Sequence, residues 1–118
     1  MPDKDDIARL KHMLEAAEDA LSFVQNKNRN SLDTDKMLSL SLVRCVEIIG
    51  EAASKLSKEC YAEFTRVPWK NIIGMRNRLI HAYYDINPDT VWSTVTEDLP
   101  PLVDELKKVI IKSKASET

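Results

Sequence analysis

The chain has 118 residues, of which 43% are hydrophobic and 31% are charged, which suits one folded domain with a modest core and excludes a disordered tail. Its net charge of −2 argues against a general nucleic-acid coat protein, which is usually basic. The polar, acidic N-terminus has the character of neither a signal peptide nor a transit peptide, and no apolar run approaches the roughly 20 residues of a membrane span, so we expect a cytoplasmic protein.

The first predicted element is an amphipathic helix from about Asp3 to Gln25. Its apolar residues recur at alternating steps of three and four and form one stripe: Ile7, Leu10, Leu14, Ala17, Leu21 and Val24. Pro2 and the acidic residues that follow it suit a helix N-terminus, where they meet the positive end of the helix dipole. His12 falls off the stripe and is predicted to lie on the surface.

A second helix is predicted to run to about Leu56, after a connection in which Asn30, Ser31 or Asp33 can cap it. One apolar stripe consists of Leu38, Leu42, Cys45, Ile49, Ala52 and Leu56. Further apolar residues widen this surface: Leu40, Val43, Val46, Ile48 and Ala53. A helix this apolar must be buried on more than one side, and a second copy of the chain is a natural cover, which predicts a homodimer.

One side of this helix carries a line of polar residues, Arg44, Glu47 and Glu51. Paired carboxylates can mark a di-iron bundle, but that site needs Glu-x-x-His partners, and neither histidine has a glutamate three residues before it. The line therefore indicates a solvated or cleft-lining stripe. Cys45 and Cys60 form no CxxC pair, so a zinc site is not expected and both are predicted to be reduced thiols.

The remaining elements are also helical. A short piece is predicted over 59–64, a helix from Pro68 to about Tyr83, and a last helix capped by Asn87 with Pro88 at its first position. Pro100 lacks a donor and should kink this last helix. Its apolar residues are Val91, Trp92, Val95, Leu99, Leu102, Val103, Leu106, Val109 and Ile110. The predicted fold is all-α: a single domain over 1–118, built as an antiparallel four-helix bundle with a short extra helix.

The charge is unevenly distributed along the chain. Residues 64–84 contain no acidic side chain and carry Arg66, Lys70, Arg76 and Arg78. This segment therefore has a charge of +4, which leaves −6 for the rest of the chain. A local positive site on an acidic body suits a small anionic target held at one cleft.

The most informative stretch is MRNRLIHAYYD, residues 75–85. On a helix with 100° per residue, Arg76 falls on the predicted buried stripe of Trp69, Ile72, Ile73, Leu79 and Ile80. A guanidinium on an apolar face needs an anionic partner, which could be Glu47, Glu51 or a phosphate of a ligand. His81 would point about 140° away from Arg76, with Asn77 four residues earlier and within reach of the imidazole.

These residues form an R-x4-H-x-Y pattern, Arg76, His81 and Tyr83, which resembles the HepT-like toxins of the HEPN superfamily. The blocks VEIIGEAASKL, VPWKNIIGMRNRLIHAYYDI and VWSTVTEDLPPL resemble helices of that family in the same order, so the resemblance covers most of the chain. One departure is Ala82, at a position where glycine is common.

The resemblance implies a dimeric four-helix bundle with a metal-independent endoribonuclease site at the two-fold interface, and no cofactor. Arg76 would hold the phosphate, His81 would transfer protons and Asn77 would orient the histidine. It also implies a minimal nucleotidyltransferase as antitoxin, which silences the toxin by adding AMP to the tyrosine of the motif, here Tyr83.

Two alternatives remain open at this point. The chain could be a catalytically silent HEPN bundle that binds a nucleotide at Arg76 or serves as the dimerisation partner of a nucleotidyltransferase. It could also be a purely structural helical adaptor in which Arg76 pairs with Glu47 or Glu51. A fold does not fix a function, so the arrangement of these side chains must distinguish the readings.

Overall fold

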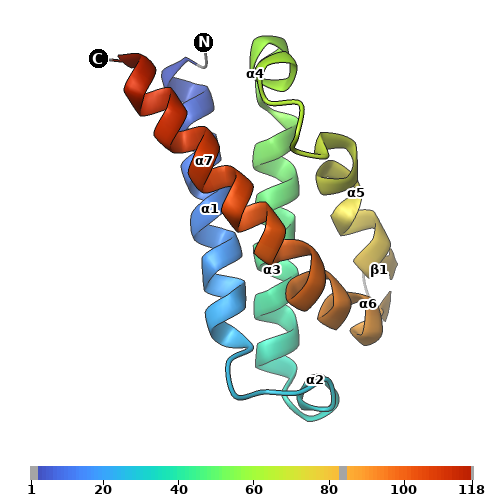
Figure 1. Cartoon of the computed structure of the whole chain (residues 1–118). Helices are drawn as coiled ribbons and strands as arrows, with labels where there is room; N and C mark the ends of the chain where they lie inside the picture. Colours follow the sequence, from blue (N-terminus) through green and yellow to red (C-terminus); the bar gives the residue numbers. More distant parts are fainter. Residues whose placement is uncertain (1–2, 83–84, 118) are drawn as a thin grey trace.

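Three long helices lie side by side in the computed structural model, which describes residues 3–82 and 85–117 (Figure 1). They are α1 (Lys4–Phe23), α3 (Lys36–Ser54) and α7 (Leu99–Glu117). Helix α1 packs against both α3 and α7, and α3 packs on its other side against α5 (Trp69–Leu79). This arrangement confirms the predicted all-α bundle. None of the helices in the described ranges is long and apolar enough to cross a membrane.

The helix starts follow local capping chemistry. Asp3 caps α1 in a capping box, in which its side chain accepts from the backbone N–H of Asp6 and its own N–H donates to the Asp6 carboxylate. Helix α3 is capped by Asp35, whose side chain accepts from the N–H of Leu38, and not by any of the three predicted residues. Those residues instead lie in and around one extra turn, α2 (Ser31–Thr34).

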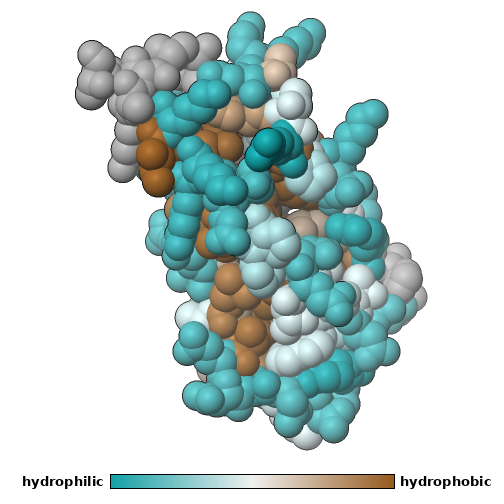
Figure 2. Space-filling view, viewed as in Figure 1, coloured by the Kyte–Doolittle hydropathy of each residue, from teal (hydrophilic) through white to brown (hydrophobic). Residues whose placement is uncertain are grey.

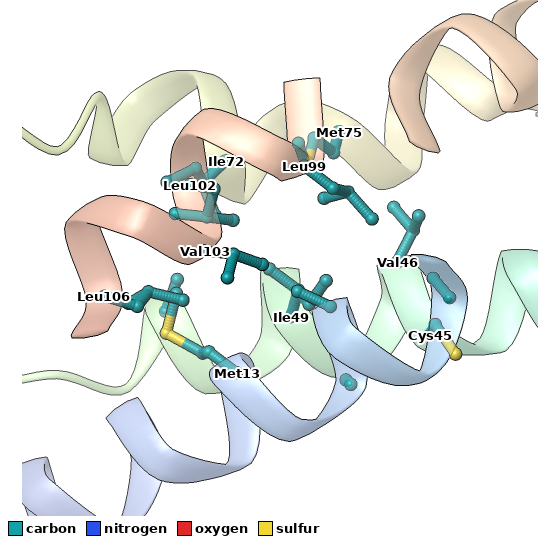
Figure 3. Packing of buried hydrophobic residues seen from close by; sticks show 14 of the residues in the cluster. Met13, Cys45, Val46, Ile49, Ile72, Met75, Leu99, Leu102, Val103 and Leu106 are labelled. Carbon is teal, nitrogen blue, oxygen red and sulfur yellow. The ribbon is translucent and has the colours of Figure 1, made fainter. Parts of the chain in front are cut away.

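The core lies where α1, α3, α5 and α7 meet (Figure 3). Helix α3 supplies buried residues on several sides, because it lies between α1 and α5: Leu38, Leu42, Val43, Cys45, Val46, Ile49, Gly50 and Ala53. Much of its unusually apolar surface is therefore covered within one chain. Met37 and Leu40, near the start of α3, remain 75% and 49% exposed.

A buried carboxylate joins the start of α1 to the start of α4 (Lys58–Glu63). Asp6 is 1% exposed and accepts from the backbone N–H and the hydroxyl of Ser57, at 2.9 and 2.6 Å. The Ser57 hydroxyl in turn accepts from the N–H of Cys60 and caps α4. Burial raises the pKa of Asp6, but the hydrogen bonds from Ser57 and Asp3 outweigh it and bring the pKa below its ordinary value.

Helix α5 ends at Leu79, so its predicted continuation to Tyr83 is wrong. The chain instead enters a small antiparallel pair, β1 (Ile80–Ala82) and β2 (Asp85–Ile86), in which Ile80 lies opposite Ile86. The N–H of Asn87 also donates to the carbonyl of Leu79 at 2.9 Å. These pairings return the chain to the start of the next helix, and they take the place of the hydrogen bonds that a longer α5 would make.

Asn87 caps α6 (Pro88–Ser93) with its side chain, as predicted. A π-helical turn, η1 (Thr94–Asp98), then joins α6 to α7. Pro100 is the second residue of α7, so the predicted irregularity takes the form of a widened turn just ahead of the residue that has no donor. Hydrophilic side chains cover most of the face seen in Figure 2, and apolar atoms reach it in a strip in its lower half, between α1 and α6, and in patches in its upper half.

Candidate active site

Helices α3 and α5 approach each other closely at Gly50. A Cβ atom at this position would lie 3.5 Å from the carbonyl oxygens of Ile72 and Ile73. The absence of a side chain at Gly50 therefore leaves the backbone of α5 directly beside α3, and a shallow depression follows the seam between the two helices.

We call this depression the α3–α5 groove; it has a volume of about 350 Å³ and is lined by Glu47, Gly50, Glu51, Ser54, Ile73, Arg76 and Asn77. Four of the predicted site residues therefore line one groove, although they come from two segments of the chain. Sequence reasoning missed Gly50 and Ser54. Their spacing contained the signal, because positions 47, 50, 51 and 54 share one face of a helix.

Arg76 is not buried, contrary to the prediction from the apolar stripe. Its side chain is 58% exposed, and Met75 takes the buried position beside Ile72 and Leu79. Ile73 was also assigned to the buried stripe, but it is 38% exposed. Water solvates a guanidinium far better than the core does, so the turn of the helix places the thioether inside and the cation in the groove.

Glu47 is the anionic partner of Arg76 in this chain. Nε of Arg76 lies 3.8 Å from Oε2 of Glu47, and Arg44 lies 3.9 Å from the same oxygen. Glu51 pairs with Lys55 instead. An exposed ion pair at this distance contributes at most about 1 kcal/mol, so the guanidinium stays accessible to a stronger anion such as a phosphate.

His81 lies in β1, beyond the end of α5. The angle of 140° from Arg76 and the four-residue helical step from Asn77 therefore do not apply, because both assume a continuous helix. Tyr83 lies outside the described residues. His81 follows Leu79, the last residue of α5, by two residues, so it is attached close to the end of the helix that carries Arg76 and Asn77.

The four cations of the acid-free segment are divided between different faces, so the expectation of one positive cleft is wrong. Arg76 lines the α3–α5 groove, and Lys70 lines an adjoining pocket. Arg66 and Arg78 lie on the other side of α5, in a hollow against α7 that also contains three carboxylates, those of Glu97, Asp98 and Glu105. Arg76 is therefore the cation best placed to bind an anion in the groove.

Neither cysteine has the environment of a nucleophile. Cys45 and Cys60 are free and buried. Burial raises the pKa of both thiols, that of Cys60 to about 12, so both are protonated at neutral pH. Within 3–82 and 85–117, no three His, Cys, Asp or Glu side chains gather as a set of metal ligands.

Comparison with known proteins gives a consistent result. Residues 13–109 match the family described as Ribonuclease HepT-like. The chain is 34% identical to "Putative RNase MJ1216" of Methanocaldococcus jannaschii, over 93% of this chain and 91% of the relative. It is 36% identical to "Putative RNase TTE0752" of Caldanaerobacter subterraneus subsp. tengcongensis, over 89% of this chain and 94% of the relative. It is 35% identical to "Probable ribonuclease HepT" of Thermococcus cleftensis, over 64% of this chain and 68% of the relative. No solved structure matches the chain.

Proposed function

Because the chain belongs to the HepT-like family of the HEPN superfamily, we propose that it is a metal-independent endoribonuclease toxin. The observation that carries the proposal is the exposed Arg76 in the α3–α5 groove, beside Asn77 and a few residues from His81. A cation held on a packed helix and exposed in a groove is suited to bind an RNA phosphate.

The reaction uses the nucleophile that RNA itself carries. The 2′-hydroxyl attacks the adjacent phosphorus while its proton passes to neutral imidazole at His81. The bond between phosphorus and the 5′-oxygen breaks, and that oxygen receives a proton from an imidazolium. Arg76 stabilises the charge on the phosphorane oxygens, and Asn77 orients the histidine. The products are a 2′,3′-cyclic phosphate and a free 5′-hydroxyl.

The test is cleavage of RNA by the purified chain in the presence of EDTA. Arg76→Ala and His81→Ala should each lower the cleavage rate at least about 100-fold and leave the melting temperature within a few degrees of the parent. Arg78→Ala is the matched control, since Arg78 lies on the opposite side of the same helix, and it should retain activity. Cleavage that EDTA abolishes, or that His81→Ala retains, contradicts this mechanism.

The active form in this proposal is a homodimer, in which a two-fold axis brings both copies of Arg76 and His81 into one cleft. The exposed Met37 and Leu40 on α3 support a second copy as their cover. Light scattering should report about twice the chain mass of 13.5 kDa. A monomer that cleaves RNA would contradict the composite cleft.

Regulation in this proposal belongs to a minimal nucleotidyltransferase that adds AMP to Tyr83. The adduct would add a phosphate to the motif, which would compete with RNA for the Arg76 guanidinium and repel RNA by like charge. Mass spectrometry of the chain after co-expression with its genomic neighbour should find additions in multiples of AMP. Tyr83→Phe should remain toxic beside the intact partner. Neutralisation of Tyr83→Phe without any adduct would mean that the partner acts by binding alone.

A further inference from the structure

A second depression adjoins the α3–α5 groove along α5. This α4–α5 pocket has a volume of about 590 Å³, and its walls include Tyr61, Pro68, Trp69, Lys70 and Ile73. Ile73 lines both depressions. A ligand that extends past Arg76 along the surface of α5 therefore passes directly into the α4–α5 pocket.

The pocket has a rigid aromatic wall. The rings of Tyr61 and Trp69 pack edge to face, with centroids 5.5 Å apart. The indole N–H of Trp69 donates to the carbonyl of Phe64, and the Tyr61 hydroxyl donates to the carbonyl of Ala53. Because the polar groups of both rings are hydrogen-bonded to backbone carbonyls, the rings present a fixed apolar surface. A ligand that binds there does not have to displace water from these polar groups.

The charge of the pocket suits an anion. Its lining contains one cation, Lys70, and no carboxylate among the described residues. Other hollows of the surface differ in this respect: that between α5 and α7 contains three carboxylates, and one beside α1 contains Glu15, Glu18 and Asp19. A base with its flanking phosphates could therefore occupy the α4–α5 pocket without like-charge repulsion from the pocket lining.

The face of α5 between the two depressions is open. Lys70, Ile73, Gly74 and Asn77 lie within one 100° arc of the helix, and Asn77 is about 10 Å further along the axis than Lys70. A Cβ atom at Gly74 would have no neighbour within 4 Å. Packing within the chain therefore does not require this glycine, and its lack of a side chain leaves a flat path between the cation and the amide.

We propose that the α4–α5 pocket binds an unstacked nucleobase of single-stranded RNA, next to the phosphate held by Arg76, with Lys70 contacting the flanking phosphate. This inference rests on the proposed ribonuclease function and specifies its substrate as single-stranded. The base packs against Ile73 and the edges of the Tyr61 and Trp69 rings, since aromatic and apolar walls bind any base by its π face. A paired base within a duplex cannot enter the pocket.

The test measures binding, not cleavage. Fluorescence anisotropy is followed for a short single-stranded 2′-O-methyl RNA and for the same backbone without bases. The 2′-O-methyl group removes the nucleophile, so binding is measured whether or not the chain cleaves RNA. The native chain should bind the RNA with bases about tenfold more tightly, which is the size of one base-stacking contact. Ile73→Ser should lose this difference, and the matched control Ile111→Ser, also at an exposed isoleucine, should keep it.

A second arm tests the lysine. Lys70→Gln should reduce the slope of log affinity against log salt by about one, as the loss of one phosphate contact does, and Lys11→Gln on α1 should leave the slope unchanged. If Ile73→Ser fails to fold, this arm still tests whether Lys70 contacts the flanking phosphate, and the comparison of the two RNAs on the native chain still tests whether a base is bound.

Two results would overturn the inference, and a third separates it from the ribonuclease proposal. Equal binding of the two RNAs by the native chain means that no base enters the pocket. If Ile73→Ser changes the molar mass by light scattering and not the preference for bases, the pocket is a contact between copies. If the native chain prefers the RNA with bases but does not cleave ordinary RNA, the result supports base binding in the pocket and contradicts the ribonuclease proposal.

Discussion

Replacing the buried Asp6 with asparagine should destabilise the fold in a pH-dependent way. The asparagine amide group would face the N–H or the hydroxyl of Ser57, and one charge-assisted hydrogen bond at 2.6 or 2.9 Å would be lost at a site that is 1% exposed. Loss of a buried hydrogen bond to a charged group costs about 2 kcal/mol. For a chain of this length, that corresponds to a fall of about 8 °C in melting temperature.

The dependence on pH separates this effect from a change in packing. The folded-state pKa of Asp6 lies below the ordinary value of 3.8, so its contribution to stability is present in full above that value. It is lost as the pH falls through the lower folded-state pKa. The difference in the free energy of unfolding between the native chain and Asp6→Asn should therefore shrink towards acid pH.

Urea unfolding followed by circular dichroism, at equal protein concentration, measures this difference at pH 7 and at intervals below pH 4. Asp5→Asn is the matched control, because Asp5 is an exposed neighbour on the same helix turn, and it should change stability by less than about 0.5 kcal/mol. A difference for Asp6→Asn that is equally large at neutral and acid pH would refute the role of the carboxylate charge.

Three further predictions follow from the packing and charges. Gly50→Ala should raise the free energy of unfolding by up to about 1 kcal/mol in urea titrations, because the added methyl makes ordinary contacts at 3.5 Å and removes a glycine from a helix interior; a large loss would mean that α5 lies closer. Glu47→Gln should change stability by less than about 1 kcal/mol and tighten RNA binding at low salt, because it removes a negative charge beside Arg76; weaker binding would show that Glu47 positions Arg76. Cys45 and Cys60 should both resist alkylation in the native chain and react on unfolding; rapid native labelling would contradict their burial.

Local chemistry made much of the fold predictable from the sequence. Asn87 caps the helix that it was predicted to cap, because a capping side chain needs only backbone N–H groups two or three residues away. The acidic residues predicted to lie at the start of the first helix include Asp3, which is its cap. The end of α5 was not predictable in this way. It depends on the pairing of Ile80 with Ile86, which is a contact between two short strands and leaves no trace in helical periodicity.

The sequence singled out four of the side chains that line the α3–α5 groove but did not predict the geometry of the groove. Helical spacing allows either Met75 or Arg76 to complete the buried stripe with Ile72 and Leu79, since the two are only 100° apart. The cost of burying a guanidinium decides between them, and this energetic argument was available from the sequence alone. The division of the cations between two sides of α5 required the packing partners of that helix, α3 and α7, to be known.

The end of α5 at Leu79 makes the candidate site modular. Arg76 and Asn77 belong to a helix whose orientation the bundle core fixes, and His81 belongs to a small hairpin attached to its end. In the proposed mechanism, substitutions in the hairpin that keep Ile86, which packs against the core, would alter proton transfer at His81 and leave the helix that carries Arg76 in place. In evolution, a few changes in the hairpin could convert a protein that cleaves RNA into one that only binds it. Exchanging the hairpin between relatives could likewise change the catalytic rate separately from the affinity for RNA.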